Sequence, residues 1–185
     1  MTLRTTRSRL RLATASLLLL VIVSLIAGLP VYVRPQVDPL RPADAVFVLG
    51  GDDWRRHMLG VELGMEGWAP KVVLSHPDGP GADWAGENCG KVYPRYELDC
   101  FLPEPPTTRG EAQELRRMAE EYGWDRVIVV TFLPHISRAR FILERCFSGE
   151  LIMIASPAEL SPWRWVSEYV YQTAGFVKAE LEPGC

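Results

Sequence analysis

The sequence predicts an α/β fold, a Rossmann-like three-layer sandwich with a mostly parallel sheet, preceded by one N-terminal transmembrane helix. Short apolar runs of strand type alternate with longer segments that have helical spacing. This alternation is typical of a parallel sheet covered by helices on both faces. A separate run of 22 uncharged residues precedes them at positions 12–33. The chain of 185 residues is long enough for one globular domain in addition to that run.

The uncharged run is long enough to cross a bilayer as a helix. Arginines at positions 4, 7, 9 and 11 precede it, so the positive-inside rule places the N-terminus in the cytoplasm and the rest outside. A cleaved signal peptide is the alternative, which we disfavour because the run exceeds a typical h-region and no A-x-A site follows it. We expect a single-pass protein of the plasma membrane, with a cytoplasmic N-terminus (1–11), a transmembrane helix (12–33), a linker (34–43) and an extracytoplasmic domain (44–185). The linker contains three prolines and is expected to be a stiff spacer off the membrane.

The charge of the exported part limits its partners. The chain has 20 basic and 23 acidic residues, and without the four leading arginines 16 basic residues remain, which gives a net charge of about −7. An acidic surface argues against binding to nucleic acid and against electrostatic attraction to an anionic membrane. An anion-binding site in this chain must therefore be a local cluster of cations.

Four strands are expected, because four short apolar runs have the length and composition of buried parallel strands, at residues 45–49, 71–75, 127–131 and 151–155. The helices that follow them are expected from Asp52 or Asp53 to Gly67, from Thr108 to about Tyr122, from Pro134 onward and from Ser161 to about Leu181. Residues 76–106 are rich in proline, glycine and polar residues, and they predict a long loop of the kind that is often functional.

Two apolar stripes run along the last predicted helix. One stripe is expected to pack on the sheet and consists of Trp163, Val166, Val170, Ala174 and Val177. The other stripe can contact the bilayer interface or cover a cleft, although we favour ordinary core packing, and it consists of Trp165, Tyr169 and Phe176.

Four cysteines in an exported chain predict a disulfide. Cys89 and Cys100 bracket a short polar loop and are the preferred pair, with Cys100–Cys146 as the alternative. Cys146 can also be a small buried hydrophobic residue near a helix end. No spacing of cysteine and histidine indicates a zinc site.

Ligands of such sheets bind at the carboxyl ends of the strands, near helix N-termini. Three segments reach that edge, and each has an arginine near the start of a helix: residues 50–55, 107–110 and 134–138. Free N–H groups and guanidinium groups together favour phosphate or carboxylate. We therefore predict an anion-binding cleft, with ligand contacts from Gly50, Gly51, Arg55, Thr108, Arg109, Gly110 and Arg138.

The third of these segments is the most informative. His135 and Arg138 lie three residues apart, on one face of the first helical turn. A cation at that place opposes the helix dipole and is easiest to explain if an anion binds. The pKa of a histidine is ordinarily near neutrality, so His135 is predicted to be a general acid or base. Asp52 or Glu111 would orient it or bind a divalent ion.

Structural interpretations of the same residues remain open. Thr108 and Glu111 also match a capping box, and Asp52 or Asp53 matches a helix cap. The two arginines that follow these aspartates can be solvated or paired with them. The Gly-Gly turn is not a G-x-G-x-x-G motif and no Walker lysine is present, so neither a nicotinamide cofactor nor an ATPase is predicted.

Four stretches, DAVFVLGGDDWRR, GWAPKVVLS, TTRGEAQEL and VIVVTFLPHISRARFIL, cover most of residues 44–147. In their order and spacing the chain resembles the bacterial family typified by SanA, ElyC and YdcF. The resemblance implies a Rossmann-like fold, commonly behind one N-terminal anchor, and a role in envelope biogenesis or barrier function. The recurrent polar positions of the family correspond here to Gly50, Gly51, Arg55, Thr108, Glu111, Thr131, His135 and Arg138, and they add Thr131 to the expected ligand contacts.

Two positions depart from the family. Ser75-His76 stands where Ser-Gly is frequent, and Glu111-Ala112 stands where an acidic residue and asparagine are frequent. S-adenosylmethionine is associated with one cytoplasmic-type member, but an exported domain would lack that cofactor. We expect a transferase or hydrolase acting on a phosphate-bearing small molecule or lipid carrier, such as a lipid-linked or nucleotide-like envelope precursor. A non-catalytic binding or scaffold module is the alternative, because no G-x-S-x-G elbow or evident triad is present.

Overall fold

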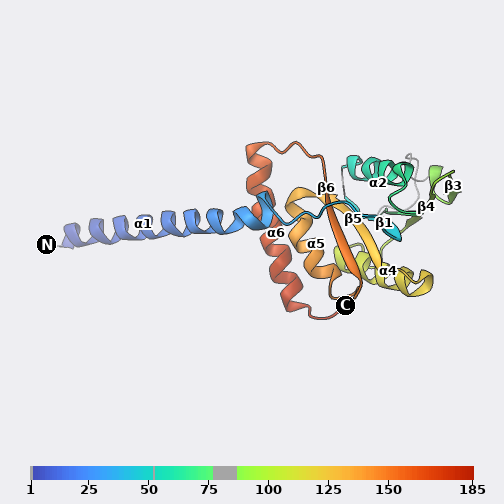
Figure 1. Cartoon of the computed structure of the whole chain (residues 1–185). Helices are drawn as coiled ribbons and strands as arrows, with labels where there is room; N and C mark the ends of the chain where they lie inside the picture. The colour runs from blue at the N-terminus through green and yellow to red at the C-terminus, as the bar shows by residue number, and fades with distance from the viewer. Residues whose placement is uncertain (1, 52, 77–86) are drawn as a thin grey trace.

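Six strands form one sheet in the order β3-β4-β2-β1-β5-β6 (Figure 1). The computed structural model describes residues 2–51, 53–76 and 87–185, with side chains at Arg9 and from Arg11 onward within these ranges. Every neighbouring pair of strands is parallel except β3 and β4. The strands are β1 (Ala45–Val48), β2 (Lys71–Ser75), β3 (Lys91–Val92), β4 (Glu97–Phe101), β5 (Arg126–Phe132) and β6 (Glu150–Ser156). The predicted α/β fold with a mostly parallel sheet is confirmed.

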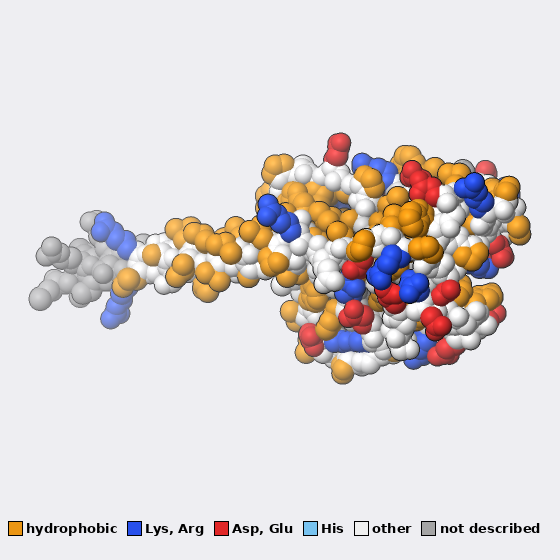
Figure 2. Space-filling view, viewed as in Figure 1, with side chains coloured by type: hydrophobic (Ala, Val, Ile, Leu, Met, Phe, Trp, Pro, Cys, Tyr) orange, Lys and Arg blue, Asp and Glu red, His pale blue; other side chains and the backbone are white. Residues whose placement is uncertain are grey.

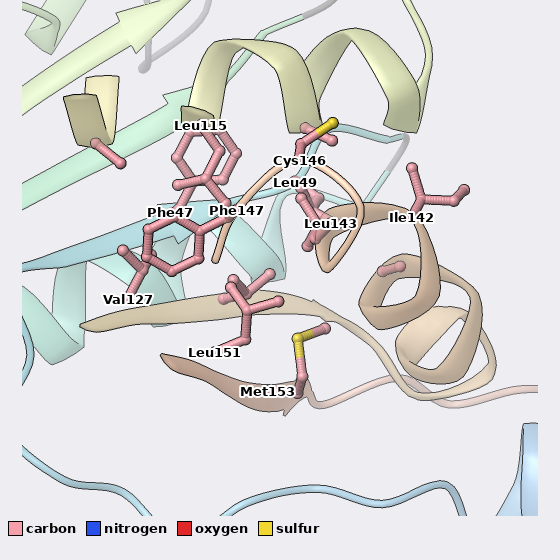
Figure 3. Packing of buried hydrophobic residues seen from close by; sticks show 14 of the residues in the cluster. Phe47, Leu49, Leu115, Val127, Ile142, Leu143, Cys146, Phe147, Leu151 and Met153 are labelled. Atoms are coloured by element: carbon pink, nitrogen blue, oxygen red, sulfur yellow. The ribbon is translucent and has the colours of Figure 1, made fainter. Parts of the chain in front are cut away.

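Helices cover both faces of this sheet and make three layers. The helical elements are α1 (Thr2–Gly28), η1 (Leu29–Val33), α2 (Arg55–Glu66), α4 (Thr108–Tyr122), η2 (Leu133–His135), α5 (Ile136–Leu143) and α6 (Pro162–Leu181). Val46 and Val48 of β1 belong to a buried cluster with Val61 of α2. Phe47 lies between them in sequence and packs with Leu115 of α4 on the opposite face (Figure 3). Both faces of β1 are therefore buried, which explains its uninterrupted apolar sequence.

The helix ends lie close to where the sequence predicts them. α2 and α4 end at Gly67 and Gly123, which have φ angles of 85° and 71°, a left-handed conformation that glycine adopts without a steric cost. α6 begins after Ser161, whose Oγ accepts a hydrogen bond from the Arg164 N–H at 3.2 Å. These glycine and serine signals were sufficient to place three helix boundaries.

The start of α4 differs from the predicted capping box. The N-cap is Thr107, whose Oγ1 accepts a hydrogen bond from the Gly110 N–H at 3.4 Å. The predicted box between Thr108 and Glu111 is therefore wrong. The carboxylate of Glu111 is consequently available for another contact, which lies in the cleft described below.

The predicted loop over residues 76–106 contains β3 and β4, so that prediction is wrong. β4 pairs in parallel with β2, and Leu98 is fully buried in the sheet. Glu97 and Asp99 flank Leu98, and both pair with Lys71 of β2 at 3.2 Å. This short alternation of charged and apolar residues is typical of a partly covered strand near a sheet edge, and it is too short to be recognised from its period.

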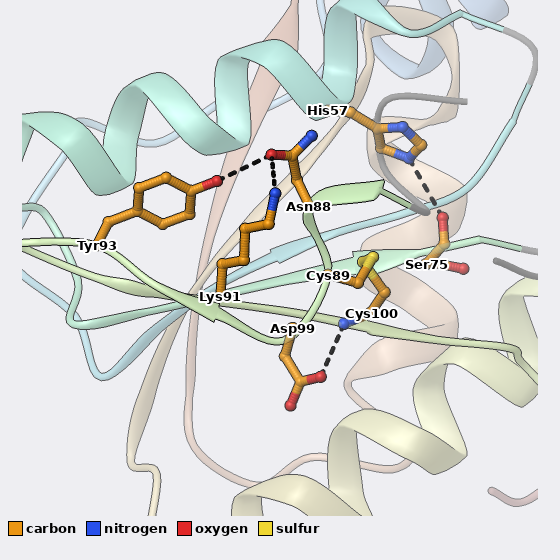
Figure 4. The surroundings of a disulfide bond; sticks show 8 residues. All are labelled: His57, Ser75, Asn88, Cys89, Lys91, Tyr93, Asp99 and Cys100. Carbon is orange, nitrogen blue, oxygen red and sulfur yellow. Dashed lines mark hydrogen bonds between the residues drawn. A yellow bond between two sulfur atoms is a disulfide. The ribbon is translucent and has the colours of Figure 1, made fainter. Parts of the chain in front are cut away.

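The described residues form two disulfides. Cys89–Cys100 joins the residues before β3 to β4, near the side chains of Asn88 and Tyr93 (Figure 4). Cys146–Cys185 joins the end of α5 to the residues beyond α6. The preferred pair is confirmed, whereas the alternative Cys100–Cys146 is wrong. Cys146 is partly a core residue, as the other interpretation held, but it is also paired.

α1 projects from the domain as a single long helix (Figure 1). Residues Arg11–Val33 of α1 and η1 are long and apolar enough to cross a membrane, as a signal sequence near an N-terminus would also be. The leucine, isoleucine and valine side chains are exposed from Leu12 to Leu29 of this stretch (Figure 2). An exposed apolar surface of this size marks a membrane or protein contact.

The predicted spacer packs against the domain instead of holding it away from α1. The Asp38 N–H donates to the Met153 carbonyl at 3.0 Å, and the Met153 N–H donates to Asp38 Oδ2 at 2.9 Å. Asp38 Oδ2 also pairs with Arg140 of α5 at 2.5 Å. Burial alone raises the pKa of Asp38, but the Met153 N–H and Arg140 outweigh it and lower the pKa below its usual value. The linker is therefore fixed to α5 and β6.

The first predicted stripe of α6 does not pack on the sheet, so that prediction is wrong. Trp163, Val166, Val170 and Val177 are exposed, with exposed fractions of 80%, 53%, 68% and 56%. α6 packs instead on α5, on η2 and on the end of α1. The second predicted stripe makes these contacts, since Tyr169 and Phe176 lie 4.9 and 6.5 Å from the ring of Tyr32, and Phe176 lies 5.7 Å from Phe141.

We predict that Asp38→Ala destabilises the full chain by about 1–3 kcal/mol, because it removes hydrogen bonds that involve a charged group. The pKa of Asp38 is lowered in the folded state, so its contribution is present above about pH 4, the usual value of an unfolded aspartate, and is lost as the pH falls further. Thermal unfolding in detergent at several pH values measures both effects.

Glu144→Ala is the matched control. Glu144 also pairs with Arg140, but at 4.0 Å and with a side chain that is 57% exposed. Its removal is expected to change the free energy of unfolding by less than about 0.5 kcal/mol. Equal losses in the two variants would contradict the assigned role of the linker.

Candidate functional site

A cleft of about 1360 Å³ opens at the carboxyl edge of the sheet. Three of its walls are the predicted segments: the turn after β1, the start of α4 and the start of α5. α6 forms a fourth wall. The structure brings eight predicted residues to this cleft, namely Gly50, Gly51, Arg55, Thr108, Arg109, Glu111, His135 and Arg138. The predicted catalytic residue Asp52 lies outside the described residues.

Glu111 lies at the centre of the site, in the first turn of α4, and is almost fully buried. The Gly50 N–H at the end of β1 donates to Glu111 Oε1 at 2.6 Å. Burial raises the pKa of Glu111, although the Gly50 N–H and the positive charges of Arg56 and Arg138 oppose this effect. Glu111 thus joins β1 to α4 and lies among cations from α2 and α5.

Arg56 supplies one of these cations from the first turn of α2, and it is 6% exposed. Its Nη1 donates to the Gly50 carbonyl at 2.5 Å, and its guanidinium lies 5.4 Å from the centroid of Phe132. A Cβ at Gly51 would collide with this guanidinium, and the φ of Gly51 is +139°. Glycine is therefore required at this turn, because it lets Arg56 pass close to the backbone.

The neighbouring Arg55, which the sequence indicated as a ligand contact, lies at the rim. Its Nε is 3.1 Å from both carboxylate oxygens of Asp53, and its side chain is 45% exposed. Asp53 also accepts the Arg55 N–H at 3.0 Å, although the N-cap residue of α2 is Trp54 and not the predicted aspartate. The sequence allowed both arginines to be solvated. The structure buries Arg56 and leaves Arg55 at the rim.

Arg138 approaches the site from α5 and is held by α6. Its Nε donates to Gln172 Oε1 at 2.7 Å, and its guanidinium lies 5.5 Å from the centroid of Tyr171. Burial lowers the pKa of Arg138, while Tyr171 and Glu111 oppose this effect. The guanidinium stays charged, because an arginine does not deprotonate in proteins. The arginine in an unfavourable helix position is thus stabilised by α6.

His135 lies between two threonines at the end of β5. Its Nδ1 is 3.0 Å from Thr131 Oγ1, and its Nε2 is 3.4 Å from Thr108 Oγ1. Burial lowers the pKa of His135 well below its usual value, and the positive charges of Arg138 and Arg56 lower it further. The ring is therefore neutral, and it can accept a proton but has none to give as an imidazolium. Thr131 does not line the cleft and orients His135 from behind.

Arg109 and Gly110 were also predicted to contact the ligand, but both have structural roles. Arg109 lines the cleft but turns toward the residues beyond α6, where its Nη2 donates to the Cys185 carbonyl at 3.3 Å and its Nη1 lies 3.8 Å from Glu182. Gly110 does not line the cleft. A Cβ at Gly110 would collide with the Pro105 carbonyl, so this glycine permits α4 to begin close to the preceding turn.

The sequence did not indicate the contribution of α6. Arg164, Glu168, Tyr171 and Gln172 all line the cleft. Glu168 and Gln172 are buried, and Glu168 accepts hydrogen bonds from Arg164 Nε at 2.8 Å and from Gln172 Nε2 at 3.0 Å. Polar residues at positions 164, 168, 171 and 172 form one face of the helix, opposite the apolar stripe. This polar face of the helix was the sequence feature that could have indicated its place in the cleft.

The donor set of the cleft suits an anion. Seven cationic side chains line the cleft, against five carboxylates. The cations are Arg55, Arg56, Arg109, Arg138, Arg145, Arg164 and Lys178, and the carboxylates are Asp53, Glu111, Glu159, Glu168 and Glu182. Among the described residues, no group of three or more histidine, cysteine, aspartate or glutamate side chains has the geometry to hold a metal ion.

The fold and the site together define an α/β protein with an arginine-lined cleft at the carboxyl edge of its sheet. Comparisons with family models, with curated proteins and with solved structures gave no significant match to this chain.

We predict that Gly51→Ala destabilises the chain more than Gly67→Ala. Both glycines have positive φ angles, so each alanine carries a backbone cost of about 1–2 kcal/mol. A Cβ at Gly67 has open space, whereas one at Gly51 displaces the buried Arg56 guanidinium and adds about 1 kcal/mol or more. Chemical denaturation of the full chain measures the difference, and equal losses would count against the tight passage of Arg56.

The lowered pKa of His135 predicts a neutral ring through about pH 6.5, where an ordinary histidine is half protonated. The unfolded chain binds a proton there and the folded chain does not, so stability is greatest above about pH 6.5 and falls below it. His135→Gln is expected to remove part of this fall. Ring resonances in a nuclear magnetic resonance titration test the assignment, which is wrong if His135 titrates near pH 6.5.

Proposed function

We propose that this chain is a single-pass membrane protein of envelope biogenesis or barrier function, whose extracytoplasmic cleft binds a phosphate-bearing ligand. One observation carries the ligand proposal: the buried Arg56 and the partly buried Arg138 line the same cleft, and both lie near Glu111, whose pKa is raised. Cations held in a partly buried cleft attract an anion more strongly than cations in bulk water do. Guanidinium groups and the start of α4 offer the donors that phosphate prefers.

The proposed topology rests on the N-terminal stretch and the cysteines. The arginines before the span favour a cytoplasmic N-terminus, which places the domain outside. All four cysteines form disulfides, as is typical of proteins in an oxidising compartment. The resemblance to the SanA, ElyC and YdcF family supports the same topology and an envelope role. An exported domain would lack S-adenosylmethionine, so a role for that cofactor is the least supported.

If the protein is an enzyme, we propose that it transfers or hydrolyses a lipid-linked or nucleotide-like precursor. His135 would act as general base, in the tautomer whose Nδ1–H donates to Thr131 and whose Nε2, beside the Thr108 hydroxyl, carries the lone pair that accepts a proton. Arg138 and Arg56 would hold the phosphate and stabilise charge that develops on it. Glu111 would keep these arginines in place.

A non-catalytic binding module is the second candidate, and the cysteines favour it. All four cysteines are in disulfides, so none can act as a nucleophile, and the described residues contain no G-x-S-x-G turn. In that case the cleft would sense or present the phosphate-bearing ligand without changing it.

We predict that Arg138→Met weakens binding of a polyprenyl phosphate by the detergent-solubilised full chain by about tenfold or more, because a charge-assisted contact is lost. Arg117→Met is the control, since Arg117 pairs with Glu114 and Glu121 on the exposed face of α4, away from the cleft. Calorimetry with polyprenyl phosphate, uridine diphosphate and inorganic phosphate compares the ligand classes. Equal binding by the Arg138 and Arg117 variants to all three would refute the anion site.

Turnover of the same compounds separates the two candidates. If the protein is catalytic, His135→Gln lowers turnover by about 100-fold or more, as expected for loss of a general base, and leaves binding within a few-fold. Binding without turnover in the parent protein supports the binding module. Unchanged turnover in His135→Gln would remove His135 from the mechanism.

A further inference from the structure

α6 has an apolar face with no partner among the described residues. Trp163, Val166, Val170, Val177 and Leu181 follow helical spacing, and each is more than half exposed. The opposite face carries the polar residues of the cleft. A contiguous exposed stripe of this kind marks a contact surface, and a helix with one apolar and one polar face is typical of proteins that lie at a membrane interface.

The contacts between α6 and α1 indicate the environment of this apolar face. Tyr169 of α6 donates its hydroxyl proton to the Leu25 carbonyl at 3.3 Å, and its ring packs against Gly28. Leu25 precedes the last apolar residue of the span, Val33, by eight residues, which corresponds to about 12 Å along an α-helix. If the span fills the bilayer core, Tyr169 therefore lies at the depth of the outer leaflet or its interface.

An apolar groove of about 350 Å³ connects the two helices at this depth. α1 and η1 contribute Leu25, Ile26, Leu29 and Val33, and α6 contributes Trp165, Val166 and Tyr169. The groove is thus continuous with both the membrane span and the exposed stripe, through Val166. Figure 1 shows α6 running across the end of α1, so a span along the membrane normal places α6 in the membrane plane.

We propose that the exposed face of α6 is a second membrane-contact element, which lies in the outer interface of the bilayer that α1 spans. This inference rests on the proposed membrane anchoring. Tryptophan at the helix start suits the interface, where an indole has both apolar and polar surroundings. Acyl chains of the outer leaflet fill the groove, and the apolar stripe is removed from water.

The orientation also narrows the ligand class. Tyr171 lines the cleft and is 63% exposed, and Ala174 lines the cleft while lying on the stripe. The cleft therefore borders the membrane-contact face at Ala174, although most of its polar lining lies on the opposite face of α6. The proposed orientation keeps this rim close to the lipid head groups, so it favours an amphiphilic phosphate over a soluble one as the ligand.

Contact quenching by brominated lipids tests this arrangement. The full chain is reconstituted into phosphatidylcholine vesicles with acyl chains brominated near the head group, and tryptophan emission is compared with that in unbrominated vesicles. Trp163→Phe is expected to remove about half of the quenching, since Trp163 and Trp165 are the two tryptophans of α6 at the interface. Trp68→Phe is the control and is expected to leave quenching unchanged, because Trp68 lies at the amino edge of the sheet, where its indole N–H donates to Glu66.

Flotation with the vesicles is scored first. A chain that does not float contradicts the membrane anchoring, and the inference fails with it. A chain that floats but shows equal quenching before and after Trp163→Phe overturns the inference and leaves the anchoring intact. Absence of quenching in a floating chain that forms dimers would assign the stripe to a second copy and would also overturn the inference.

Discussion

The buried carboxylate of Glu111 is the contact on which the arrangement of the cleft depends. It accepts the Gly50 N–H from the end of β1, and it lies among guanidinium groups from α2 and α5. An isolated buried charge costs several kcal/mol, so the arginines and Glu111 stabilise one another only as a group. Arg138 extends the group to Gln172, and Gln172 extends it to Glu168 of α6. Five separate elements are thereby held in one geometry, which is the pre-organisation that an anion site requires.

The part of the molecule that adjoins α1 follows a second constraint. Linker residues commonly leave a domain free to move relative to its anchor. Here Asp38 is hydrogen-bonded to Met153 in both directions, and Ser137 Oγ donates to the Val31 carbonyl at 2.8 Å. Tyr32 adds a hydroxyl contact of 2.8 Å to Thr173 of α6. The span, the linker and α6 are therefore packed as one unit.

The sequence predicted the features that depend on local chemistry or on sheet topology. Buried strands, glycine and serine helix boundaries and the meeting of three segments at one edge follow from residue type and from the shared direction of parallel strands. Features that depend on tertiary contacts were not predicted. Adjacent helical residues point about 100° apart, so the choice between Arg55 and Arg56 depends on how α2 is rotated on the sheet. The exposed stripe of α6 was predicted to pack on the sheet. The periodicity of the helix does not show which of its two apolar faces contacts α5 and the end of α1.

The fixed junction between span and domain has a mechanical consequence. A transmembrane helix that is longer or shorter than the hydrocarbon layer adjusts by tilting. If α1 spans the bilayer as proposed, the Asp38–Arg140 ion pair transmits such a tilt to the whole domain, because no flexible tether absorbs it. Bilayer thickness would therefore set the height and inclination of the cleft above the lipid head groups. The inclination of the cleft and that of α1 are in this sense coupled through one rigid junction.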